Sequence, residues 1–294
     1  MTEQPPIQPT PVGALRFNTV TAQLEYFDGN VYVNITTDSP EQHTGGTRGL
    51  FAGGSTPGGV VDEIDFINVD TTGNALDFGN IGTARRGVAC LGSRSRGIMA
   101  GGRVSPDLNT IEFVTFASTG NASDFGDLTI TSHHGTGLSN ATRGISAGGQ
   151  SSPGVYSKKI EFITMATQGD AQEFGELSTV GREPGAISNS TRGIIAGGRA
   201  NPDGTRSDVI DFITIATLGN ATDFGNLLAA ASFIRGCSSS TRGVFGGGQA
   251  PGAQNVLQFV TISTAGNATD FGDLDDGTPH SCSVCSDAHG GLAQ

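Results

Sequence analysis

The sequence predicts an all-β fold, a β-propeller with four-stranded blades of about 48 residues. Three observations support this. Glycine supplies 46 of the 294 residues, about twice the usual share of ~7%, and proline only 12. Short apolar runs of Ile, Val, Leu and Phe lie between the glycines, and one pattern of them recurs five times. No segment keeps an apolar period of 3.6 residues, so we expect few helices.

The repeat is first seen as Thr-Arg-Gly-Leu-Phe-Ala-Gly-Gly, which starts at Thr47. Its arginines are Arg48, Arg96, Arg143, Arg192 and Arg242, spaced by 48, 47, 49 and 50 residues. A β-branched and aromatic run such as Ile-Asp-Phe-Ile-Thr-Ile follows each arginine, and then Gly-Asn-Ala-x-Asp-Phe-Gly or a close variant. With a small-residue strand before the arginine, each repeat contains four short strands. Helical solenoids are excluded because they need amphipathic helices, which the sequence lacks. A stacked β-solenoid remains an alternative, although its coils are usually shorter than the repeat of about 48 residues.

Both ends of the chain carry partial repeats. From His280 onward the sequence resembles the first two strands of another repeat, with His289 in place of the arginine. Leu15-Arg-Phe-Asn-Thr-Val lines up with a third strand, and Asp28-Gly29 with the end of a fourth. We therefore expect six blades, the last one a composite of both termini that leaves no exposed edge. The alternative is five blades and a separate N-terminal hairpin. Residues 1–42 are a proline-rich leader and hairpin, and residues 43–294 the propeller.

Two charged positions recur in every repeat: the arginine and the acid before Phe-Gly. The acids are Asp77, Asp124, Glu173, Asp223 and Asp270. A ring of catalytic carboxylates is one interpretation, but a residue required in every blade usually supports the blade itself. An arginine can tie its strand to a neighbouring turn or acid, and an aspartate can cap the Gly-Asn turn. We expect the double glycines to allow close backbone approach near the axis.

The segments between the second and third strands differ in every repeat, and we expect them on one face as candidate binding loops. Tolerant surface loops are the equally weighted alternative. The residues singled out there are Pro57, Pro106, Pro153, Lys158, Lys159, Pro202, Arg206 and Pro251.

Charge and targeting signals restrict the classes of partner. The net charge of −12 disfavours nucleic-acid binding, because an acidic surface repels phosphate backbones. No run of 18 apolar residues predicts a membrane-spanning helix, and the first 13 residues lack the features of a signal peptide. We therefore expect synthesis and folding in a cytoplasm.

Catalytic and metal-binding motifs are scarce. Cys282-x-x-Cys285, flanked by His280 and His289, could form a small metal site, but no second CxxC accompanies it. We expect half-buried thiols instead, and no metal or cofactor. The chain has no nucleophile elbow, no HExxH, no Trp and three Tyr. A broad protein contact is thus favoured over a deep sugar pocket, and an enzyme is not expected.

The repeats look like Kelch repeats in length and in their double glycine, although the usual Kelch Trp and Tyr are absent. They more closely resemble Kelch-like repeats of tailed bacteriophages, notably phages of marine bacteria and cyanobacteria. The shared motifs are Arg-Gly-x-x-Gly-Gly-Gly, Asp-Phe-Ile-Thr-Ile-Ala-Thr and Gly-Asn-Ala-Thr-Asp-Phe-Gly, from about Thr44 onward. Separately, Leu-Arg-Phe-Asn-Thr followed by Leu-Glu-Tyr-Phe-Asp-Gly is similar to a β-hairpin module of phage virion proteins, with Tyr32 at its usual Trp position.

These resemblances imply a virion structural protein that is made in the host cytoplasm. A tail-fibre, baseplate or capsid-decoration propeller is expected. Its expected partners are other virion proteins, and a host surface receptor or glycan is a further candidate partner. A homo-oligomer is left open. Two other functions remain: an intracellular protein-binding scaffold, and a glycan-processing propeller enzyme with acids converging at one mouth of the ring.

Overall fold

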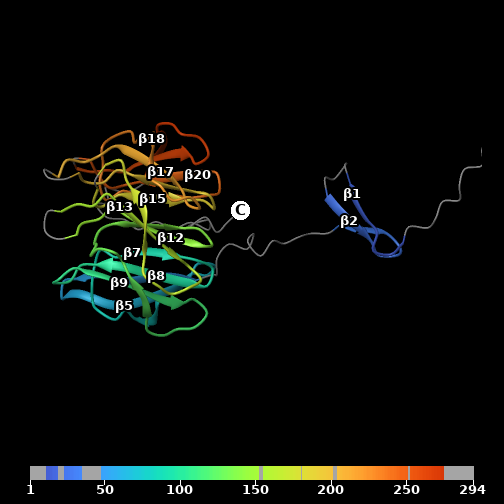
Figure 1. The fold of residues 1–294 in the computed structure, drawn as a ribbon, viewed down its shortest axis with the longest axis horizontal. Helices are drawn as coiled ribbons and strands as arrows, with labels where there is room; N and C mark the ends of the chain where they lie inside the picture. Colours follow the sequence, from blue (N-terminus) through green and yellow to red (C-terminus); the bar gives the residue numbers. More distant parts are fainter. Residues whose placement is uncertain are drawn as a thin grey trace, which may run out of the picture. The chain divides into compact units, whose positions relative to one another are not determined.

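The computed structural model describes residues 11–18, 23–34, 48–151, 155–179, 181–200, 204–250 and 252–274. The chain divides into two compact units, Met1–His43 and Thr44–Gln294, and each is described by itself. In the described ranges every regular element is a β-strand, so the all-β prediction is confirmed (Figure 1). Within those ranges no helix has the length and apolar character needed to cross a membrane.

The described part of the first unit forms an antiparallel sheet in the order β1-β2-β3. Its strands are β1 (Leu15–Asn18), β2 (Gln23–Phe27) and β3 (Tyr32–Asn34). A polar cluster holds one face together: Glu25 accepts hydrogen bonds from Arg16 at 2.7 Å and Asn18 at 2.9 Å. The guanidinium of Arg16 also lies 3.6 Å from the centre of the Tyr32 ring. The opposite face, with Leu15, Phe17, Leu24 and Tyr26, is apolar and exposed.

The described residues of the second unit form five sheets that correspond to the five repeats, together with one two-stranded ribbon. The first sheet is β4 (Arg48–Thr56), β5 (Gly59–Asn68) and β6 (Leu76–Asn80). The second is β7 (Ala89–Gly92), β8 (Arg96–Gly102), β9 (Leu108–Thr115) and β10 (Ser123–Asp127), and the third is β11 (Thr136–Ser139), β12 (Arg143–Ala147), β13 (Lys159–Thr164) and β14 (Gln172–Glu176). The fourth is β15 (Gly185–Ser188), β16 (Arg192–Ala196), β17 (Val209–Thr214) and β18 (Thr222–Asn226), and the fifth is β19 (Arg235–Ser238), β20 (Arg242–Gly246), β23 (Val256–Thr261) and β24 (Thr269–Asp273). A small ribbon of β21 (Gln249–Ala250) and β22 (Gly252–Ala253) lies between β20 and β23 in the chain.

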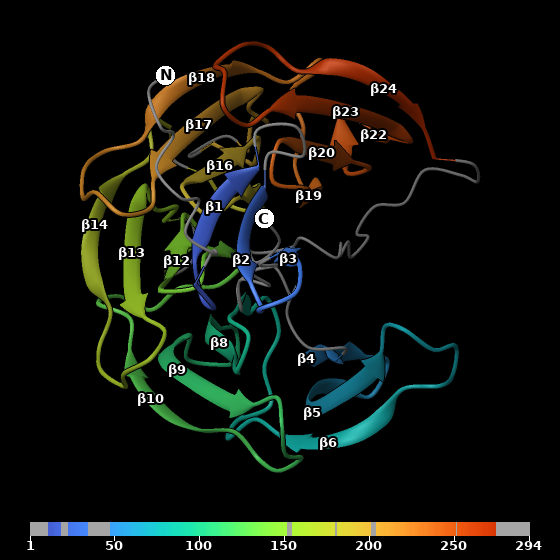
Figure 2. The same cartoon turned by 90° about the vertical axis from the view of Figure 1, so that its right-hand side faces the viewer.

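These sheets follow one another around a common centre, with β10, β14, β18 and β24 on the outside (Figure 2). The inner strands β7, β11, β15 and β19 pack against their neighbours in that order. Each core cluster joins two adjacent sheets; one combines Ile145 and Phe174 of the third sheet with Ile195 and Ile213 of the fourth. The fold is therefore propeller-like, with four-stranded antiparallel sheets packed face to face and not stacked along a line.

Hydrogen bonds between sheets repeat from one interface to the next. The hydroxyl of Ser139 donates to Gly92 O at 2.7 Å, that of Ser188 to Ser139 O at 2.9 Å, and that of Ser238 to Ser188 O at 2.8 Å. Near the outer edge, the side chain of the Gly-Asn turn accepts a backbone N–H of the preceding sheet, as Asn220 does from Glu176 at 3.1 Å. The sheets are thus joined by polar contacts at both the inner and the outer strands.

Glycine is required where the outer strands meet the next turn. A Cβ built on Gly79, Gly126, Gly175 or Gly225 would lie 2.2–2.6 Å from the backbone of the following Gly-Asn turn. The residue before each glycine is a buried phenylalanine whose ring packs edge-on against the phenylalanine of the third strand, as Phe224 does against Phe212 at 6.0 Å. The expected close approach at the double glycines also occurs, since a Cβ on Gly101 would lie 2.2 Å from Ser132 O.

The ring is open between the fifth and first sheets among the described residues (Figure 2). Phe271 is 51% exposed, whereas its four equivalents in the other repeats are 2–3% exposed. On the other side of the opening, Val69 is 55% exposed, whereas Met165, Ile215 and Ile262 are buried. The first sheet has three described strands, and β4 has no described partner on its inner edge. Phe51 also faces the opening and is 53% exposed, whereas its counterparts Met99 and Ile195 are buried against the preceding sheet. The expected composite blade involves residues 275–294, which lie outside the described ranges.

Candidate functional site

In the second to fifth sheets, the residue directly after the double glycine pairs with a residue just before the inner strand of the same sheet. The pairs are Arg86 with Arg103, His133 with Gln150, Arg182 with Arg199, and Ser232 with Gln249. Each pair forms a single antiparallel bridge. This places eight side chains that differ between repeats at the same end of the inner strands.

The next residue along the chain forms a backbone ring around the centre. Gly87, His134, Glu183 and Phe233 all adopt left-handed backbone angles, with φ of 65°, 54°, 64° and 57°. The N–H groups of His134, Glu183 and Phe233 each donate to the carbonyl of the counterpart in the preceding sheet, at 2.8, 2.7 and 3.0 Å. Three of these positions are not glycine, so a conformation that usually requires glycine or asparagine is imposed here by the surrounding sheets.

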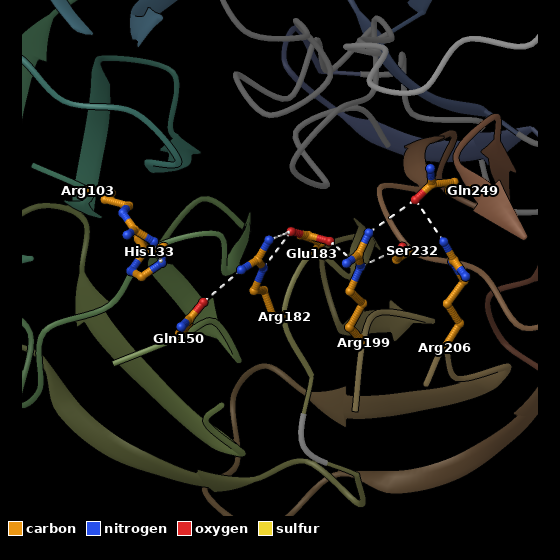
Figure 3. Close-up of polar contacts among 9 residues, drawn as sticks. All are labelled: Arg103, His133, Gln150, Arg182, Glu183, Arg199, Arg206, Ser232 and Gln249. Atoms are coloured by element: carbon orange, nitrogen blue, oxygen red, sulfur yellow. Dashed lines mark hydrogen bonds and ion pairs between the residues drawn. The ribbon is translucent and has the colours of Figure 1, made fainter. Parts of the chain in front are cut away.

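Arginine, glutamate and glutamine side chains form one connected network on this ring (Figure 3). The Glu183 carboxylate, about 1% exposed, is shared by Arg182, which donates through Nε at 2.5 Å, and by Arg199 at 3.1 Å. Arg182 also donates to Gln150 Oε1 at 2.8 Å. Gln249 Oε1 accepts from Arg199 at 3.1 Å and from Arg206 at 2.8 Å. Three arginines are therefore held around one buried acid and two amides, and we refer to Arg86, Arg103, Arg182, Arg199 and Arg206 as the arginine cluster.

Two histidines extend the network to the second sheet. His133 Nδ1 lies 3.2 Å from Asp107 Oδ2, and its Nε2 lies 3.4 Å from Arg103 Nη1. Burial lowers the pKa of His133, and Arg103 and Arg182 lower it further, while Asp107 opposes them. Burial lowers the pKa of His134 to about 4, assisted by the positive charge of Arg182 and other cationic neighbours. Both imidazoles are neutral at pH 7, and the charges around them are predominantly positive.

The five repeat arginines lie between the sheets and not in this cluster. Nη1 of Arg48, Arg96, Arg143 and Arg192 donates to a backbone carbonyl of the next sheet at 2.5–3.0 Å. Each of the five guanidinium groups lies 4.5–4.9 Å from the centre of a phenylalanine ring in its own sheet. Arg242 faces the opening of the ring, is exposed, and has no carbonyl partner among the described residues.

The repeated acids are exposed on the outer strands and do not converge. They are Asp77, Asp124, Glu173, Asp223 and Asp270. Asp223 accepts from its own backbone neighbour Gly225 at 3.1 Å, and Asp270 from Gly272 at 3.3 Å. The turn that precedes each of these acids is joined to the preceding sheet by its own asparagine or aspartate side chain.

Comparison with known proteins gives no family for this chain. No protein-family model matches it, and no curated protein matches it. The site must therefore be interpreted from its own geometry.

Of the candidate loop residues, Arg206 belongs to the arginine cluster. Pro57 and Pro106 are exposed, Lys158 donates to Ser178 O at 3.0 Å, and Lys159 donates to Thr129 Oγ1 at 2.5 Å. Pro153, Pro202 and Pro251 lie outside the described residues, as do Cys282 and Cys285. In the part of the chain that the structure describes, no group of three or more His, Cys, Asp or Glu could hold a metal ion.

Sequence reasoning missed His133, Arg182, Glu183 and Ser232. They precede the inner strands, where no repeated signature draws attention to them. A signal was nevertheless present, because Arg86, Arg103, Arg182 and Arg199 are arginines that the repeat does not require. Sorting charges into those shared by all repeats and those confined to a few would have selected them.

The low pKa of His134 makes stability depend on pH. Between about pH 6.5 and pH 4 the unfolded chain binds a proton here that the folded chain does not, so stability falls as the pH is lowered through this window. We expect His134→Asn, which tolerates the left-handed backbone, to remove about 1–3 kcal/mol of the stability lost between pH 7 and pH 4.5. Urea unfolding of both proteins at the two pH values measures this. An identical pH dependence in the two proteins would contradict the assignment.

Proposed function

We propose that this chain is a non-catalytic structural and binding component of a bacteriophage particle: a tail-fibre, baseplate or capsid-decoration protein. The resemblance of the repeats and of the N-terminal hairpin to phage virion proteins supports this. The observation that carries the proposal is the exposed apolar face of the first unit, which is suited to burial against another protein. Its occupant in this proposal is a neighbouring virion protein.

That apolar face is formed by alternate residues of β1 and β2. Leu15 pairs with Tyr26, and Phe17 pairs with Leu24, so the four side chains share one face of the sheet. Their exposures are 63% for Leu15, 60% for Phe17, 43% for Leu24 and 39% for Tyr26. Contiguous apolar surface of this kind is characteristic of interaction sites. The opposite face carries the Arg16–Glu25 pair, so only one side of the sheet is suited to docking.

The second unit, in this proposal, closes into a six-bladed propeller whose last blade contains the C-terminal half repeat. Two observations favour closure: Phe271 and Val69 are exposed on opposite sides of the opening, where their counterparts elsewhere are buried or half-buried. The N-terminal hairpin differs from the third and fourth strands of the repeats in its register. β1 pairs with β2 in an unbroken register, whereas every described pair of third and fourth strands has a register shift. Closure would give a rigid scaffold for the variable segments.

Quantitative mass spectrometry of purified particles tests the assignment. We expect this chain in virions, at a ratio to the major capsid protein that separates capsid decoration from a tail appendage present in few copies. Its absence from purified virions would refute the assignment and favour an intracellular scaffold.

The same measurement on variants tests the docking face. Phe17→Ser should reduce incorporation at least tenfold, because it places a polar group in the centre of the apolar face. Leu218→Ser is a matched control, since Leu218 is 53% exposed in the second unit. Equal incorporation of the two variants would show that the face is not the attachment site.

A further inference from the structure

The arginine cluster concentrates positive charge on an acidic protein. Its five arginines belong to a chain with 16 Lys and Arg against 28 Asp and Glu. Two acids belong to the same network: Glu183 between Arg182 and Arg199, and Asp107 beside His133. The cluster therefore has a formal charge of +3 with neutral histidines, whereas the whole chain has −12. Positive charges held this close together repel one another, and this repulsion costs free energy unless a negative charge lies nearby.

The fold does not require arginine at these positions. Equivalent positions after the double glycine are occupied by Gln150 and Gln249, and the position equivalent to Arg182 is Ser232 in the next repeat. These neutral residues form the same backbone bridges. The arginines are therefore additions to a scaffold that folds with uncharged residues at the same places.

Hydrogen-bond donors exceed acceptors in the cluster. Each guanidinium has five N–H groups, and the shared acceptors are the carboxylate of Glu183 and the amide oxygens of Gln150 and Gln249. Gln249 Oε1 already accepts from two arginines. Nε of Arg206 is buried and has no hydrogen-bond partner among the described residues, and Glu183 Oε2 forms an ion pair with Arg199 but accepts no hydrogen bond there. A buried donor without a partner is costly, so an additional acceptor at this point would stabilise the cluster.

The guanidinium groups are also held in place before any ligand arrives. Arg182 lies 6.0 Å from the centre of the Tyr156 ring, and Arg199 lies 5.5 Å from that of Phe233. Glu183 fixes the Nε side of Arg182, and Arg199 is fixed by Glu183 and Ser232. Figure 3 shows the side chains of Arg182, Arg199 and Arg206 extending in the same direction from neighbouring segments. Preorganised forks of this kind match the planar or tetrahedral oxygens of carboxylate, sulfate and phosphate.

We propose that the arginine cluster is a binding site for an oxyanion, in which Arg199 and Arg206 are the principal donors and Arg182 completes the contact. The ligand is a sulfate, phosphate or carboxylate group, either as a free anion or carried on an anionic polysaccharide. A long nucleic acid is disfavoured, because the acidic remainder of the protein repels its backbone. The site does not depend on the chain's presence in a virion.

Isothermal titration of the purified full chain with sodium sulfate and sodium phosphate tests the proposal, with chloride at matched ionic strength as the reference. We expect saturable binding, and at least a tenfold loss of affinity in both Arg199→Gln and Arg206→Gln. Glutamine already stands at the position of Arg199 in two other repeats, and the unfolding midpoints of both variants without sulfate check that they fold. Arg94→Gln is the matched control, because Arg94 is exposed at the other end of β7 and carries the same charge.

The outcomes separate specific binding from general screening and distinguish the two sources of the ligand. Binding that is lost in Arg199→Gln and Arg206→Gln but kept in Arg94→Gln supports the site. Equal losses in all three variants, or a heat signal that chloride reproduces, would overturn it, as would no saturable binding.

Dextran sulfate that binds at least tenfold more tightly than inorganic sulfate, while uncharged dextran does not bind, identifies a polysaccharide. Equal affinity per sulfate group identifies a free anion. None of these results depends on whether particles contain the chain, so the site and the proposed virion function can fail separately.

Discussion

Gly225→Ala should destabilise the second unit by about 3–5 kcal/mol. A Cβ at this position would lie 2.4 Å from Gly266 O and 2.5 Å from the carbonyl carbon of Gly266, both in the backbone of the next sheet. A backbone cannot rotate away as a long side chain can, so the fourth and fifth sheets must separate. With φ at 148°, an alanine is also strained before it meets its neighbour. Chemical unfolding monitored by circular dichroism measures the loss.

Gly219→Ala separates strain from the close contact. Gly219 has φ of 153°, but no atom lies within 4 Å of its built Cβ. We expect this control to cost only about 1–2 kcal/mol. If the two variants are equally stable, the close approach of the sheets does not limit the residue at 225.

Gly272→Ala then tests whether the ring closes. Gly272 occupies the same repeat position at the open end, and no atom of the described residues lies within 4 Å of its built Cβ. A closed propeller predicts a loss close to that of Gly225→Ala, because a further blade would cover this face. A loss as small as that of Gly219→Ala would mean that no turn between a third and a fourth strand covers this face, and would refute a complete sixth blade.

Glu112→Gln should cost about 3 kcal/mol or more, because it leaves the charge of Arg85 uncompensated inside the protein. Arg85 is 1% exposed, and its Nη2 lies 2.7 Å from Glu112 Oε2. Burial lowers the pKa of the Arg85 guanidinium, and Glu112 counteracts this effect. Glutamine would still accept the 2.8 Å hydrogen bond from Gly82 N, but its amide group would not neutralise Arg85.

The repeats provide matched controls for this pair. Glu161 accepts a backbone N–H from Thr129 at 2.8 Å in the same way, and Gln258 does so from Leu228 at 2.8 Å. Glu161→Gln should therefore cost less than about 1 kcal/mol. The double variant Arg85→Ala with Glu112→Gln reproduces the Ala231 and Gln258 of a later repeat, and should recover a substantial part of the loss. A Glu112→Gln variant as stable as Glu161→Gln would contradict the role given to the ion pair. Urea unfolding of the four proteins measures these differences.

The repeated features of this protein were determined by its sequence. The run Arg-Gly-Ile-Ile-Ala forms β16 (Arg192–Ala196), because β-branched residues favour strands and the glycines that follow favour a turn, and both preferences act locally. The expectation of all-β sheets in repeats was correct for the same reason. The close approach at the double glycines also followed from composition, since only glycine adopts those backbone angles without a Cβ clash.

The tertiary structure alone decided which residues meet around the centre. Glu183 lies between Arg182 and Arg199, and Gln249 joins Arg199 to Arg206 across 43–50 residues of chain. No local pattern predicts such contacts, because they depend on how neighbouring sheets are placed. The carbonyl that accepts from a repeat arginine lies about 70 residues away, in a turn of the next sheet, as Ile215 does for Arg143. A repeated sequence specifies each sheet, but the charges that collect at the centre depend on packing between sheets, where residues distant in the chain become neighbours.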